Sequence, residues 1–139
     1  MISERDVIKV CMPFPNDTSG LALLKHYYIC NQNNNNNKLL FKCQTQKPNM
    51  ITKYGRDGFR EKFYPIRSNS LVPFRQDTVV DKEQVFNLQN TTVPLIYLSQ
   101  EKPSNIPISI YGNVVREISG PRSININKAK FVTLNPGCT

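Results

Sequence analysis

Residues 25–45 constrain the fold more than any other part of the chain. They hold two apolar runs, Tyr27–Cys30 and Leu39–Cys43, joined by a polar connection rich in asparagine. Two short apolar runs on either side of turn-forming residues are typical of a β-hairpin, here one with a long loop. The start of the first strand of a hairpin lies beside the end of the second. We therefore expect His26 and Thr45 to meet at the end opposite the asparagine loop.

This end of the hairpin gathers the most reactive side chains of the sequence. His26 is the only histidine, and Lys25, Thr45 and Lys47 are expected beside it. The asparagines 33–37 are interpreted as a hairpin tip without a function, because asparagine favours turns over strands.

Further β-strands are predicted on both sides of the hairpin. Residues 6–12 are mostly apolar and β-branched, and the prolines that follow end the strand because proline cannot donate to a β-ladder. Residues 78–80 form another predicted strand, and residues 81–83 a turn. Short strands are also predicted over 85–88 and 93–98, and a closing strand over 123–134.

One helix is predicted near the end of the chain, over Pro107–Ser119. Apolar residues recur there at four-residue spacing, which is the period of a helix with one buried side. Ser104 is a plausible cap, and Gly120-Pro121 ends the helix. Many short strands followed by one helix indicate a mainly β protein with minor α, built as a small curved barrel with helical cover.

The length of 139 residues predicts one domain. With 39% hydrophobic and 20% charged residues, the composition is that of a globular protein. No apolar run approaches the roughly 18 residues of a membrane span, and residues 1–10 lack the apolar core of a signal peptide. We expect a cytoplasmic protein without a membrane partner.

The net charge of +8 has two interpretations: solubility, or a polyanionic partner such as nucleic acid. Residues 49–70 interleave basic side chains with aromatic ones, a pattern suited to single-stranded nucleic acid because phosphates meet charge while bases stack. The alternative is a surface loop that its aromatic residues hold against the core. The basic residues of this region are Lys53, Arg56, Arg60, Lys62 and Arg67.

The four cysteines are interpreted as small core residues, since no C-x2-C pair occurs and one histidine cannot complete a common zinc site. Cys43, two residues before Thr45, is the candidate if a cysteine is catalytic. The sequence has no phosphate-binding glycine loop, no carboxylate cluster with metal spacing and no nucleophile elbow. We therefore expect neither a metal nor a cofactor.

The order of the motifs over residues 4–86 resembles the MazF/PemK toxins of type II toxin–antitoxin systems. The segments that carry the resemblance are Arg5–Val10, Pro13–Pro15, Asn16–Gly20, His26–Cys30, Gln44-Thr45 and Asp77–Lys82. The resemblance implies an SH3-like barrel over residues 1–139, with an insertion at about 47–70. His26 stands in place of the family's catalytic arginine, and Tyr27 in place of the proline after it.

Members of this family cut single-stranded RNA without a metal, through attack of the ribose 2′-hydroxyl on the adjacent phosphate. By resemblance, this chain would be such an endoribonuclease, with a homodimer and a cognate antitoxin as possible partners. His26 is the candidate general base or acid, because imidazole transfers protons near neutral pH. Thr45 would bind the phosphate. The candidate RNA-binding residues are Lys25, Lys47, Lys53, Arg56, Arg60 and Arg75.

Two other classes of function are compatible with the sequence. An SH3-like barrel with a basic surface can bind RNA, DNA or a protein without chemistry, because a fold does not determine a function. The missing arginine favours this non-catalytic module, of toxin–antitoxin or phage-related type. A nuclease inhibitor or another phage-type interaction protein is the third class.

Overall fold

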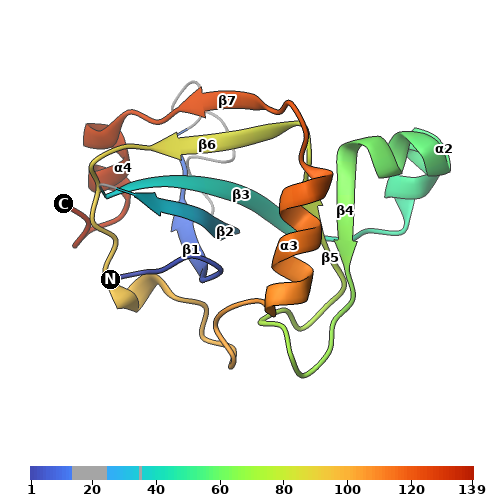
Figure 1. Ribbon diagram of the computed structural model, residues 1–139, viewed down its shortest axis with the longest axis horizontal. Helices are drawn as coiled ribbons and strands as arrows, with labels where there is room; N and C mark the ends of the chain where they lie inside the picture. The colour runs from blue at the N-terminus through green and yellow to red at the C-terminus, as the bar shows by residue number, and fades with distance from the viewer. Residues whose placement is uncertain (14–24, 35) are drawn as a thin grey trace.

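The computed structural model describes residues 1–13, 25–34 and 36–139, which form a mainly antiparallel β-sheet with helices around it (Figure 1). The strands are β1 (Val7–Cys11), β2 (Lys25–Asn34), β3 (Asn37–Thr45), β4 (Phe63–Ile66), β5 (Thr78–Asp81), β6 (Gln84–Leu88) and β7 (Arg122–Asn125). The helices are α2 (Asn49–Lys62), α3 (Ile108–Glu117), α4 (Lys128–Leu134) and the short 3₁₀ helix η1 (Leu95–Tyr97).

Strand β3 is the centre of the sheet. Its first edge pairs with β2, which pairs in turn with β1. Its second edge is shared: residues 43–45 pair with β5, and residues 38–40 pair with β6. β5 and β6 are consecutive in the chain, and Lys82 and Glu83, within the turn predicted at residues 81–83, connect them; Asp81 is the last residue of β5. β4 extends the sheet beyond β5, and β7 runs parallel to β6.

Alternation of side chains along β2 and β3 divides the core into two clusters, one on each face of the sheet. Tyr28 and Leu40 belong to one cluster, together with Phe86 and with Phe131 of α4. Ile29 and Phe41 belong to the other, which includes Val114 of α3. Figure 1 shows α3 lying across the sheet and α4 at the end away from α2. We call the side of the sheet that carries the cluster with Phe131 the α4 face, and the side that carries the cluster with Val114 the α3 face.

The structure confirms the predicted mainly β architecture, the strands predicted at residues 6–12, 78–80 and 85–88, which are observed as β1, β5 and β6, and the late helix. The helix begins after Pro107 without a side-chain cap, so Ser104 is not its cap. The strands form an open sheet, and β1 and β4 are the ends of its main path.

The hairpin is confirmed, but its loop is shorter than predicted. The β-ladder continues through the asparagines as far as the pair Asn34 and Asn37. Asn36 lies in the turn with a positive φ of 61°, a conformation that asparagine tolerates better than most residues. Its Nδ2 donates to Thr92 Oγ1 at 3.0 Å, so this end of the hairpin is attached to the segment before η1.

Three predictions for other segments were wrong in part or entirely. The surface loop considered for residues 49–70 contains α2 and β4 instead, and α2 is interrupted at Gly55, where φ is 71°. The strand expected at 93–98 contains η1 instead, since Pro94 cannot donate to a ladder. The closing strand expected at 123–134 divides into β7 and α4, with Asn127 capping α4 through its side chain.

The outer edge of β1 is occupied by Asn135, a fully buried residue just after α4. The Cys11 N–H donates to Asn135 Oδ1 at 2.9 Å, and Asn135 Nδ2 donates to the Cys11 carbonyl at 2.8 Å. Farther along β1, Ile8 forms a β-bridge with Leu98. These contacts satisfy backbone groups that an edge strand otherwise leaves open.

Replacing Asn135 with alanine should lower the free energy of unfolding by about 2–4 kcal/mol, because both polar groups of Cys11 would lose their partner. Urea denaturation followed by circular dichroism measures the difference. Asn125→Ala, which removes an exposed amide on β7, should change the free energy by less than about 0.5 kcal/mol. Equal stability of Asn135→Ala and the parent protein would contradict this role of Asn135.

Candidate nucleic-acid interface

The ends of the hairpin lie together as predicted, but the side chains of His26 and Thr45 point to opposite faces of the sheet. Tyr27 pairs with Cys43, so the same register puts His26 opposite Gln44. His26 is two residues before Tyr28 and shares its α4 face, whereas Thr45 is two residues after Cys43 and shares its α3 face. The expected convergence of imidazole and hydroxyl is therefore wrong.

His26 lies on the α4 face in a half-buried position, where its neighbour on β1 is Val10. Burial and the nearby Lys42 ammonium lower the pKa of the imidazole from its usual 6.5. Both causes disfavour the protonated form. The structure thus describes His26 as a largely neutral side chain beside a lysine.

Hollows beside Tyr27 and Thr45 lie on the α3 face, and two further hollows lie beyond the end of β3, against α2 (Asn49–Lys62) and β4. Pro65, which lines one of these two, alternates with Tyr64 and Ile66 of the α3-face cluster and therefore points to the other side of the sheet.

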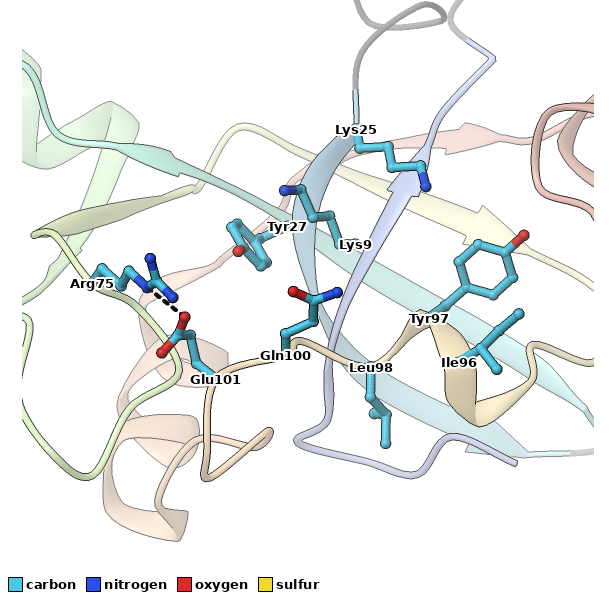
Figure 2. Close-up of a pocket in the computed structure, with 9 residues that line it drawn as sticks. All are labelled: Lys9, Lys25, Tyr27, Arg75, Ile96, Tyr97, Leu98, Gln100 and Glu101. Atoms are coloured by element: carbon cyan, nitrogen blue, oxygen red, sulfur yellow. Dashed lines mark hydrogen bonds and ion pairs between the residues drawn. The ribbon is translucent and has the colours of Figure 1, made fainter.

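One hollow beside β1 and β2 encloses about 500 Å³ and is lined by Lys9, Lys25, Tyr27 and Arg75 together with residues 96–98, 100 and 101. We call it the β1 hollow. Figure 2 shows Lys9 and Tyr27 between the Arg75–Glu101 pair on one side and Tyr97 on the other. Lys9 Nζ lies 5.3 Å from the centre of the Tyr27 ring, a cation–π contact.

Thr45 lines the next hollow, which encloses about 200 Å³ and shares Tyr27 and Arg75 with the β1 hollow. We call it the Thr45 hollow. Thr45 is exposed and pairs with Thr78 of β5. Gln44 and Gln76 also line this hollow, so neutral hydrogen-bonding groups lie beside the Arg75 cation.

Beyond Thr45, a hollow of about 540 Å³ lies against α2, and a smaller one beside it is lined by Lys47. The two share Gln46, Ile51 and Asp77. We call the larger one the α2 hollow; Arg56, Arg60 and Arg67 line it.

Together these four hollows define what we call the basic face. Seven cationic residues line it against two carboxylates, Glu101 and Asp77. Glu101 is paired with Arg75, at 2.5 Å between Oε1 and Nε, and Asp77 Oδ1 accepts the Ser68 N–H at 2.9 Å. The cationic residues are Lys9, Lys25, Lys47, Arg56, Arg60, Arg67 and Arg75.

Arg75 is held in place by the apolar residues that precede it. Val72 and Phe74 are buried in the cluster on the α3 face, and the Phe74 ring meets Tyr27 edge-on at 5.9 Å between centroids. Ser68 Oγ donates to the Phe74 carbonyl at 2.7 Å. The anchored loop leaves the Arg75 side chain 84% exposed, where it borders both the β1 and Thr45 hollows.

Of the eight residues predicted for the site, the structure brings six to the basic face: Thr45, Lys25, Lys47, Arg56, Arg60 and Arg75. His26 lies on the α4 face. Lys53 lines none of these four hollows, and its Nζ lies 5.2 Å from the Tyr54 ring centre on α2.

Sequence reasoning missed Lys9 as a member of this surface, and it named Arg67 among the basic residues of the 49–70 region but not among the candidate RNA-binding residues. Lys9 is the only polar residue of its apolar strand, and alternation puts it on the same face as Tyr27, its partner on β2. The alternation along β1 would have identified Lys9 once the pairing of β1 with β2 was known. Arg67 depended on the unforeseen path of α2 and β4.

The structure does not support a catalytic cysteine at position 43. Cys43 is buried, and burial raises the pKa of its thiol, which disfavours the reactive thiolate. None of the four cysteines, all of which lie among the described residues, is in a disulfide bond, and Cys30 and Cys138 are also buried. Over the described residues, no three histidine, cysteine or carboxylate side chains are placed to hold a metal ion.

Comparison with known proteins gives no relative: no protein family, no curated protein and no solved structure matches this chain. Within the described part of the chain, no helix has the length and apolar character needed to cross a membrane. The function must therefore be argued from the basic face itself.

An NMR titration of the imidazole should give His26 a pKa below 6.5, and Lys42→Gln should raise it by removing the neighbouring positive charge. Because the folded pKa is lowered, the contribution of neutral His26 to stability is complete above 6.5 and is lost as the pH falls toward the folded pKa. Lys9→Gln, on the other face, is the control and should leave the pKa unchanged. A wild-type pKa above 6.5 would contradict this placement of His26.

Proposed function

We propose that the basic face binds single-stranded RNA. The observation that carries the proposal is two pairs of hollows, each pair joined by shared lining residues and the two pairs adjoining where Gln46 follows Thr45 and Asp77 follows Gln76, which together have seven cations and only two carboxylates. Cationic side chains along a groove bind the phosphates of a nucleic acid and release its counterions. The net charge of +8 attracts the same polyanion over a longer range.

The side chains between the cations favour a single strand. Tyr27 is half-buried and borders two hollows, so part of its ring is available to an unpaired base. Thr45, Gln44 and Gln76 supply neutral hydrogen-bonding groups beside Arg75. Such groups can recognise base edges and the ribose 2′-hydroxyl, which distinguishes RNA from DNA.

The geometry favours binding over cleavage. Transfer of the 2′-hydroxyl proton requires a base within hydrogen-bonding reach of the RNA. No histidine lines the four hollows, and His26 projects from the α4 face of the sheet. We therefore prefer the non-catalytic binding module to the endoribonuclease expected from the resemblance.

We also propose that the sheet is a divergent form of the SH3-like barrel of MazF/PemK proteins. Support comes from the order of β1, the β2–β3 hairpin, the β5–β6 turn and the late helix, and from the division of β3 between two partner strands. A homodimer and a cognate antitoxin remain predictions from that resemblance alone.

Neutralising the basic face should weaken binding to a fluorescent, unstructured RNA of about ten nucleotides. We expect Lys25→Gln and Arg75→Gln each to reduce the affinity roughly three- to tenfold, and each lost phosphate contact to lower the slope of log affinity against log salt by about 0.7. Fluorescence anisotropy at several salt concentrations measures both quantities.

Arg122→Gln is the matched control, because Arg122 lies on β7 and lines none of the four hollows. It removes the same charge and should leave affinity and slope nearly unchanged. If all three variants lose the same affinity, the effect is one of total charge and the proposed face is wrong. The proposal also fails if the parent protein does not bind RNA.

A further inference from the structure

The α2 hollow differs from the rest of the basic face in its concentration of arginine. Arg56 and Arg60 are four residues apart in the part of α2 that follows Gly55, so they lie on the same side of the helix. Arg67 comes directly after β4 and reaches the hollow from another side. The wall is completed by the apolar residues Ile51, Phe59 and Pro65.

These three arginines have no acidic partner among the described residues. The ion pairs of the described chain join other residues, and none of the three guanidinium groups lies within 4.0 Å of a carboxylate. Asp77 is the only carboxylate in the lining, and its Oδ1 already accepts the Ser68 N–H. A guanidinium group is weakly hydrated and its planar donors fit two phosphate oxygens at once.

The number of cations fits a phosphate at the end of a chain better than one within it. A terminal phosphate monoester carries a charge of about −1.5 to −2 at neutral pH and offers three free oxygens. An internal diester carries one charge and offers two free oxygens. Three guanidinium groups and the Asp77 carboxylate give the hollow a formal charge of +2, which balances the monoester better than the diester, and each guanidinium group can donate to one or two of the three free oxygens.

The hollow is also placed where an end of the RNA would arrive. Gln46 and Asp77, which line it, directly follow Thr45 and Gln76 of the Thr45 hollow, so the α2 hollow adjoins that hollow at the end of β3 without sharing a lining residue with it. Figure 1 shows α2 and β4 at the end of the sheet away from α4. We propose, on the basis of the proposed RNA binding, that the α2 hollow holds the terminal phosphate monoester of the bound strand.

The test uses three versions of one short RNA, with a 5′-phosphate, with a 3′-phosphate, or with neither. Anisotropy at pH 7.5 should show at least about tenfold tighter binding for one of the two phosphorylated forms. The preference should decrease at pH 5.5, where the monoester loses much of its second charge. Whichever end is preferred identifies the direction of the strand on the basic face.

Arg60→Gln and Arg67→Gln should reduce this preference to about twofold or less. The readout is the ratio of the affinities for the phosphorylated and unphosphorylated RNA, because loss of a cation of the basic face also weakens binding of the unphosphorylated RNA. Lys53→Gln makes the same change of charge on the same helix outside the hollow, and should keep the full preference. Equal affinity of the parent protein for all three RNAs would overturn the inference and leave the proposed function standing. Failure of every RNA to bind would overturn both.

Discussion

Hydrogen bonding of β3 to three other strands is the constraint from which the rest of the structure follows. β2 occupies one edge of β3, while β5 and β6 divide the other. Because side chains alternate along a strand, this central position assigns every residue of the hairpin to one of two buried clusters or to one of two surfaces. Phe41 and Cys43 therefore fix where Thr45 points, and Leu40 and Lys42 lie on the face of His26.

The hairpin, β1 and α3 could be predicted because each carries its own periodicity or turn residues in a short segment. The face of His26 could not be foreseen from proximity of the strand ends, because a shift of one residue along a strand exchanges its faces. The bulge between Cys30 and Gln32 could not be predicted from the sequence either. α2 was missed because Gly55 and Gly58 weaken a helical pattern that tertiary packing of Phe59 supports.

The basic residues of the chain are not equivalent, and only the structure separates their roles. Lys38 is buried, and its Nζ donates to the Thr91 carbonyl at 2.6 Å, so this lysine stabilises the fold. Lys62 and Lys82 pair with acidic residues. The cations of the basic face come instead from five parts of the chain, namely β1, β2, the β3–α2 connection, α2 and the β4–β5 connection, and most lack a carboxylate partner among the described residues. Their common position carries the proposed function.

The most direct test is a map of the RNA contact on the folded protein. Backbone amide shifts can be followed by NMR while an unstructured single-stranded RNA is added. The account predicts that the largest shifts fall at residues 9, 25–27, 45–47 and 75–77. Shifts concentrated instead on β7 and α4, with those segments unchanged, would contradict the assignment of the basic face.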